Sequence, residues 1–207
     1  MKPAKPDAAG DQVTGASAVN IANFLTVLRI ACVPLMVALL FASGGHDQEL
    51  RWWAAAVFVV AALTDLLDGA IARRKGLVTN FGKIADPIAD KALIGAALIS
   101  LSILGDLAWW VTILILAREL GITVLRFWVI EHGVIPASRG GKVKTVAQGV
   151  AITMYIAQFP GLPWWPAASM LMMAIAVILT LVTGVDYVVR AVRMRSRAKK
   201  LPETASS

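Results

Sequence analysis

Six apolar segments joined by short polar connections restrict the fold of this 207-residue chain more than any other feature. A helix that crosses a bilayer needs about 20 mostly apolar residues. Segments of roughly that length cover residues 22–42, 52–72, 86–104, 108–130, 144–159 and 166–189, of which the fifth is the shortest and contains glycine. We therefore predict an all-α, polytopic membrane protein with six transmembrane helices.

The composition supports this prediction. Apolar residues make up 58% of the chain, charged residues only 16%, and the mean hydropathy is +0.72. A disordered chain or a soluble domain of this length could not carry so much apolar side chain. The single cysteine, Cys32, excludes an internal disulfide framework and a cysteine-based zinc site.

The basic residues predict an orientation. The net charge is +7, but no basic stripe interleaved with aromatic residues is present, so lipid phosphates are favoured over nucleic acid as the partner. Only Arg51 lies on one predicted side of the membrane, and the other side holds Lys2, Lys5, Arg73, Arg74, Lys75, Lys83, Arg139, Lys142, Lys144, Arg193, Arg195, Arg197, Lys199 and Lys200. This asymmetry predicts that both termini are cytoplasmic. Tryptophan pairs at 52–53, 109–110 and 164–165 fall at the predicted outer ends, where indole rings prefer the interface.

The two ends of the chain differ in composition from its middle. Residues 1–20 are rich in Pro, Ala, Gly, Asp and Ser without periodicity, which is typical of a flexible tail. We expect residues 1–20 to form a cytoplasmic tail, residues 21–190 a six-helix transmembrane catalytic domain, and residues 191–207 a basic cytoplasmic tail.

Four aspartates lie where the second and third segments meet. Asp65 and Asp68 are three residues apart and Asp86 and Asp90 are four apart, so each pair shares one face of a helix. A short connection places both pairs at one depth, and ionisable residues inside a span indicate function. Because four carboxylates repel one another, one or two divalent cations are needed to compensate them. Oxygen ligands favour Mg²⁺, Mn²⁺ or Ca²⁺ over zinc.

Each aspartate also has a structural interpretation. Asp86 followed by Pro87 is typical of a helix N-cap with a first-turn proline. Asp90 could compensate the dipole of that first turn. Asp65 or Asp68 could pair with Arg73. None of these interpretations explains all four acids together.

The spacing of these residues resembles the signature of the CDP-alcohol phosphatidyltransferase family. All eight fixed positions of the signature are present, and they are Asp65, Asp68, Gly69, Ala72, Arg73, Gly82, Asp86 and Asp90. The resemblance covers about residues 20–190 and implies the fold of that family. It also implies transfer of the phosphatidyl group of CDP-diacylglycerol to an alcohol, with release of CMP. Residues 20–29, 80–91, 116–119 and 135–145 are most similar to members whose acceptor is sn-glycerol 3-phosphate and whose product is phosphatidylglycerophosphate.

The resemblance implies roles for the residues. Mg²⁺ or Mn²⁺, two per active site, would be held by Asp65, Asp68 and Asp86, and Asp90 would take the proton of the acceptor hydroxyl and also contact a metal. Gly69, Arg73 and Thr79 match positions that hold the CDP group, and Gly82 would clear space for it. One side of the first segment carries the polar residues Asn23, Thr26 and Arg29. They could make polar contacts to CDP-diacylglycerol, or they could make helix–helix hydrogen bonds instead.

The phosphate of the acceptor requires a second basic site, for which Arg118, Arg139, Lys142 and Lys144 are candidates. Alternatively, the last three form a solvated positive loop, and Arg118 pairs with Glu119 inside the helix bundle. The resemblance further implies a homodimer in the bacterial plasma (inner) membrane, multi-pass, with its active site facing the cytoplasm.

Other functions share some of these features. A CDP-dependent cardiolipin synthase or a phosphatidylinositol phosphate synthase would have the same acids and a different acceptor pocket. A small divalent-cation transporter would place acids near mid-membrane. No nucleophile motif is present, and His46 and His132 fall in loops on opposite sides, so we predict direct displacement without a phosphatidyl-enzyme intermediate.

Overall fold

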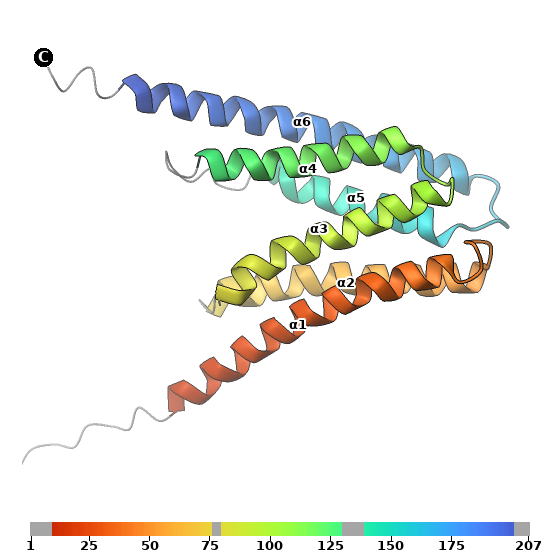
Figure 1. The fold of residues 1–207 in the computed structure, drawn as a ribbon, viewed down its shortest axis with the longest axis horizontal. Coiled ribbons are helices and arrows are strands. Elements are labelled where there is room, and N and C mark those ends of the chain that lie inside the picture. The colour runs from red at the N-terminus through yellow and green to blue at the C-terminus, as the bar shows by residue number, and fades with distance from the viewer. Residues whose placement is uncertain (1–9, 76–79, 130–138, 201–207) are drawn as a thin grey trace, which may run out of the picture. The chain divides into compact units, whose positions relative to one another are not determined.

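The computed structural model describes residues 10–75, 80–129 and 139–200, with side chains described within 24–64, 88–125 and 140–194. These residues form helices and no strand (Figure 1). The helices are α1 (Gly10–Phe41), α2 (Gln48–Lys75), α3 (Asn80–Ile103), α4 (Trp109–Val129), α5 (Arg139–Ala157) and α6 (Trp165–Lys200). The predicted all-helical class is confirmed, and each predicted apolar segment overlaps one helix. Residues 10–20, predicted as part of a flexible tail, are helical in α1, and α6 continues into the predicted basic tail as far as Lys200.

The chain divides into two compact units, Met1–Ala96 and Ala97–Ser207. In the first unit, α1 and α2 are antiparallel neighbours joined by a tight turn (Figure 1). Gly44 and Gly45 adopt left-handed φ angles of 63° and 79° in this turn, which residues with a Cβ rarely adopt. Asp47 then caps α2, because its carboxylate accepts a hydrogen bond from the Leu50 amide at 3.0 Å.

One buried face of α1 packs against α2. Its members recur every three or four residues, which is the spacing of a single helix face; they are Thr26, Arg29, Cys32, Met36 and Leu40. On α2, Ala54, Phe58 and Ala61 are buried in the same unit. The first unit is therefore held by an apolar interface that also contains one fully buried arginine.

In the second unit, α6 packs against both α5 and α4. The end of α3 is tied to α4 by a hydrogen bond of 2.7 Å between the hydroxyls of Ser102 and Thr112. The Thr112 hydroxyl also lies 3.3 Å from the Leu98 carbonyl oxygen. Gly105, with a φ of 80°, turns the chain between the two helices.

Large apolar side chains are exposed along the helices, among them Val124 at 68%, Val185 at 63% and Ile113 at 61%. Water would not tolerate this much exposed apolar surface. Among the described residues, α1 and α6 contain apolar stretches long enough to cross a membrane, Phe24–Phe41 and Trp165–Met194. Helix hydroxyls such as those of Thr64, Thr123 and Thr153 also donate to the carbonyl four residues earlier, which satisfies them without water. These observations suggest a membrane protein.

Candidate functional site

The acidic signature lies where α2 ends and α3 begins. Asp68 is seven residues before the end of α2, and Asp86 is six residues after the start of α3. At 1.5 Å per residue, both positions lie about 10 Å inside their helices. Four residues, 76–79, connect the two helices, so the helix ends must lie close together. The backbone thus supports similar depths for the two pairs of acids.

The helix bounds correct two sequence-based interpretations. α3 begins at Asn80, so Asp86 is neither an N-cap nor in the first turn, and Pro87 lies inside the helix. Asp90 lies ten residues after the start of α3 and so is not in its first turn either, and Asp65 and Asp68 lie ten and seven residues before the end of α2 at Lys75. The helix dipole acts mainly within the terminal turn, so it accounts for neither pair. Helix capping therefore does not explain why an aspartate occupies position 86.

The side chains of Asp65, Asp68 and Asp86 lie outside the described ones. Among the described side chains, no group of three or more His, Cys, Asp or Glu residues could hold a metal ion. Asp90 is half-buried on α3. Convergence of the four carboxylates thus stays a prediction, and the donor set itself, four oxygen ligands on two connected helices, fits a hard divalent cation.

The residues expected to bind CDP-diacylglycerol lie on α1, α2 and α3, except Thr79, which falls between α2 and α3 in the sequence. Thr26 and Arg29 belong to the buried face of α1, with 2% and 0% of their surfaces exposed. Burying a guanidinium costs free energy unless the group is paired, and an ionisable residue inside a membrane-spanning helix usually indicates a functional site. Four others lie on described helical backbone, but their side chains are outside the described ones; they are Asn23, Gly69, Arg73 and Gly82. Thr79 lies outside the described residues.

A buried basic cluster forms in the second unit around Glu119. Arg118 Nη1 donates to Glu119 Oε1 at 3.0 Å, and Lys144 Nζ forms a short ion pair with the same oxygen. Only 15% of the Arg118 side chain and 7% of the Lys144 side chain are exposed. The alternative that Arg118 pairs with Glu119 is therefore confirmed. Two cations and one anion leave this cluster with a net charge of +1.

Arg118 is also braced against α6. Its Nε donates to the Thr180 carbonyl at 3.1 Å, and its Nη2 donates to the Thr183 hydroxyl at 2.9 Å. A Cβ built on Gly184 would meet Arg118 Nε at 3.2 Å, so this glycine permits the close approach of the arginine. The guanidinium is thus fixed by α4 and α6 together.

The four basic candidates are only partly brought together. Arg118 and Lys144 meet at Glu119, whereas Lys142 is exposed on α5 and the Arg139 side chain is outside the described ones. Thr183 is a partner of Arg118 that sequence reasoning missed, because no local pattern relates residues 65 positions apart.

Sequence reasoning also missed Gln148, which lies one helical turn from Lys144 on α5. Its side chain has no exposed surface, and neither its Nε2 nor its Oε1 has a hydrogen-bond partner among the described residues. Gln148→Leu should therefore stabilise the fold by about 1 kcal/mol or more, because it removes an unsatisfied buried amide. Thermal unfolding in detergent measures this change.

Thr180→Val is the matched control for Gln148→Leu. The Thr180 hydroxyl is equally buried but already donates to the Ala176 carbonyl at 2.7 Å, so its removal should bring no gain. Equal or lower stability of Gln148→Leu relative to the unmodified chain would show that the amide is satisfied in the folded protein.

Comparisons with known proteins cover both the acidic signature and the cluster of Arg118, Glu119 and Lys144. Residues 19–182 match the model of the family described as CDP-alcohol phosphatidyltransferase. A probable phosphatidylglycerophosphate synthase of Mycobacterium tuberculosis is 54% identical over 183 residues, which cover 88% of this chain and 87% of that protein. A CDP-diacylglycerol–glycerol-3-phosphate 3-phosphatidyltransferase of Bacillus subtilis is 38% identical, with 81% and 93% covered. A protein of the same name from Rickettsia felis is 37% identical over 171 residues, with 81% and 93% covered.

Proposed function

The chain belongs to the CDP-alcohol phosphatidyltransferase family, and we propose that it transfers the phosphatidyl group of CDP-diacylglycerol to sn-glycerol 3-phosphate. The products are phosphatidylglycerophosphate and CMP. One observation carries this proposal: relatives named for that activity are 37–54% identical over more than four-fifths of the chain. The acidic signature on α2 and α3 lies within the matched residues.

The acids divide the work of the reaction. Asp65, Asp68 and Asp86 hold Mg²⁺ or Mn²⁺, two ions per site, which supply positive charge against the diphosphate when bound. Asp90 accepts the proton from the primary hydroxyl of glycerol 3-phosphate. The hydroxyl oxygen forms a bond to the phosphorus of the phosphatidyl group, the bond from that phosphorus to the CMP oxygen breaks, and CMP leaves. The displacement is direct.

The nucleotide is held by residues around the acids. Gly69 and Gly82 let the ligand approach the helix backbone, and Arg73 offers a planar fork for phosphate. Thr79 adds a hydroxyl on the connection between α2 and α3. The polar residues Asn23, Thr26 and Arg29 of α1 complete this set. The burial of Thr26 and Arg29 supports the assignment.

The phosphate of glycerol 3-phosphate is bound by basic residues of α4 and α5. The cluster of Arg118, Glu119 and Lys144 supports this assignment, because it is buried and carries a net positive charge. Arg118 is held by α6 and so acts as a fixed cation, and Lys144 is buried against the same Glu119 carboxylate. Lys142 and Arg139 supply further positive charge from the start of α5.

Lys144→Met should raise the KM for glycerol 3-phosphate by roughly tenfold or more, because one charge-assisted contact to phosphate is lost. The KM for CDP-diacylglycerol should stay unchanged. Steady-state assays of CMP release with each substrate varied in turn measure both constants. Arg190→Met is the control, because Arg190 is exposed and pairs only with its helix neighbour Asp186 among the contacts described. An unchanged KM in Lys144→Met would remove this lysine from the acceptor site.

The membrane setting belongs to the same proposal. The six helices cross the bacterial plasma membrane, both termini and the acids face the cytoplasm, and the protein is a homodimer. Tryptophans at the starts of α2, α4 and α6 support this topology, since Trp53, Trp110 and Trp164 are 58%, 62% and 57% exposed. Exposed indole rings at the ends of transmembrane helices are typical of a membrane interface.

An acceptor panel tests the function. The purified chain receives CDP-diacylglycerol with glycerol 3-phosphate, inositol phosphate or phosphatidylglycerol, and CMP release is followed. We expect release with glycerol 3-phosphate alone. Release only with inositol phosphate or phosphatidylglycerol would assign the chain to another branch of the family. Metal flux through liposomes without nucleotide, and no CMP release with any acceptor, would favour a transporter.

A further inference from the structure

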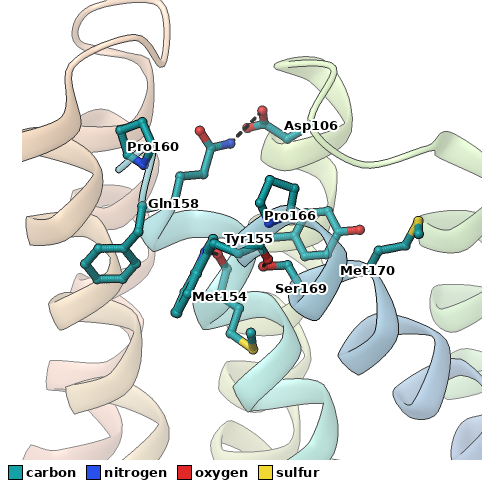
Figure 2. A pocket seen from close by; sticks show the side chains of 10 residues that line it. Asp106, Met154, Tyr155, Gln158, Pro160, Pro166, Ser169 and Met170 are labelled. Carbon is teal, nitrogen blue, oxygen red and sulfur yellow. Dashed lines mark hydrogen bonds between the residues drawn. The ribbon is translucent and has the colours of Figure 1, made fainter. Parts of the chain in front are cut away.

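A cavity of about 360 Å³ lies in the second unit where α5 ends and α6 begins (Figure 2). Its walls come from the end of α5, the connection to α6, the first turns of α6 and the connection between α3 and α4. The lining is mostly apolar and aromatic, and its members are Asp106, Met154, Tyr155, Gln158, Phe159, Pro160, Trp165, Pro166, Ser169 and Met170. None of these residues belongs to the acidic signature or to the cluster around Glu119.

Asp106 is the one charged residue among the ten that line the cavity. Gln158 Nε2 donates to Asp106 Oδ1 at 2.9 Å, and the two side chains point toward each other (Figure 2). This hydrogen bond fixes the carboxylate at the wall. A fixed negative charge in a half-buried cavity attracts a cationic group and disfavours a ligand group that carries only negative charge.

The backbone at Gln158 reinforces this view of the pair. Gln158 has a φ of 35°, the one positive φ among non-glycine residues in the described part of the chain. Glycine is the low-cost residue where a helix ends in this conformation. A glutamine there accepts backbone strain, and strain of this kind gathers at functional positions. The side chain that it provides is the one that holds Asp106.

The aromatic rings that line the cavity indicate which kind of cation it binds. Tyr155, Phe159 and Trp165 line the cavity, and Trp165 is fixed because its Nε1 donates to the Met154 carbonyl at 3.1 Å. Its ring meets Phe159 edge to face, with centroids 4.5 Å apart. Calcium needs about six to eight oxygen ligands, which this lining does not provide. Aromatic faces beside a carboxylate suit an organic ammonium group instead.

We propose that this cavity binds the primary ammonium headgroup of an amine-bearing phospholipid, with Asp106 as the counter-charge. The volume is at the lower end of the range for ligand pockets, which fits a headgroup rather than a whole lipid. The setting also fits a lipid, because the exposed indoles of Trp109, Trp110 and Trp164 flank the same connections. The lipid source rests on the membrane setting proposed above.

Native mass spectrometry of the full chain in detergent tests the proposal. Phosphatidylethanolamine, its N-acetyl derivative and phosphatidylglycerol are offered at equal concentrations. We expect the chain to retain phosphatidylethanolamine at least about fivefold over the N-acetyl lipid, which lacks the ammonium charge. Asp106→Asn, which keeps the shape and can still accept from Gln158, should lose this preference. Asp186→Asn, which changes a partly exposed acid that pairs with Arg190, should keep this preference.

The rate of CMP release in the same preparations separates this proposal from the proposed function. Asp106→Asn should leave that rate unchanged, which also shows that the variant folds. Equal retention of all three lipids, or an undiminished preference in Asp106→Asn, would overturn the ammonium site. Complete loss of the preference on adding free ethanolamine at the lipid's concentration would overturn the lipid as its source.

Discussion

Asp68→Asn should lower the rate of CMP release by roughly 10³-fold or more at saturating Mg²⁺. The reason is that Asp68 would hold a metal ion whose positive charge balances the negative charge of the diphosphate. Asp68 lies on α2 three residues from Asp65, and both positions are well inside the helix. The substitution keeps the size of the side chain and removes only its charge. Turnover is measured as CMP released from CDP-diacylglycerol in the presence of glycerol 3-phosphate.

Asp186→Asn is the matched control for this variant. It also neutralises an aspartate within a helix, but Asp186 is a partly exposed residue of α6 whose carboxylate pairs with Arg190 at 2.9 Å. An exposed pair of this kind contributes little, so activity should stay at the unmodified level. Appreciable turnover of Asp68→Asn at saturating Mg²⁺ would contradict a ligand role for Asp68.

Asp90→Asn should separate substrate binding from transfer. The affinity for CDP-diacylglycerol should be retained, while the rate of transfer falls by roughly 10²–10⁴-fold, the usual contribution of a general base. Asp90 is half-buried on α3, one turn after Asp86. Equilibrium binding of the nucleotide lipid and single-turnover CMP release measure the two quantities independently.

The pH dependence of single-turnover transfer distinguishes a base from a structural acid. A general base gives a rate that rises with pH as its carboxyl ionises, and Asp90→Asn should lose this limb of the profile. Lys91→Met, at the neighbouring half-buried position, is the control for disturbance of α3. An equal loss of binding and transfer in Asp90→Asn would assign it a structural role.

The helical class and the location of each helix could be predicted from apolar segment length alone. The ends of the helices could not, because α2 and α3 continue through polar residues whose composition is typical of a loop. Asp86 shows the consequence. With Pro87 after it, the local sequence is typical of a helix start, yet α3 begins at Asn80. Local capping preference is worth about 1 kcal/mol, which tertiary packing readily exceeds.

The acidic signature could be found from spacing, since its members are near one another in sequence. The basic cluster could be predicted only in part. Arg118 and Glu119 are adjacent, but Lys144 is 25 residues from Glu119 and the Thr180 carbonyl is 62 residues from Arg118. Only the packing of α4, α5 and α6 brings these groups together. The cavity beside Asp106 gives no sequence signal at all, because its polar and aromatic residues come from separate connections.

Binding of Mn²⁺ followed by electron paramagnetic resonance tests the central claim most directly, because it reports the acids without relying on turnover. The unmodified chain, Asp68→Asn, Asp86→Asn and Asp186→Asn are titrated with Mn²⁺ in the presence of CDP-diacylglycerol. We expect bound Mn²⁺ in the unmodified chain and in Asp186→Asn, and its loss from the two variants of α2 and α3. Equal Mn²⁺ binding by all four proteins would contradict a metal site shared by these helices.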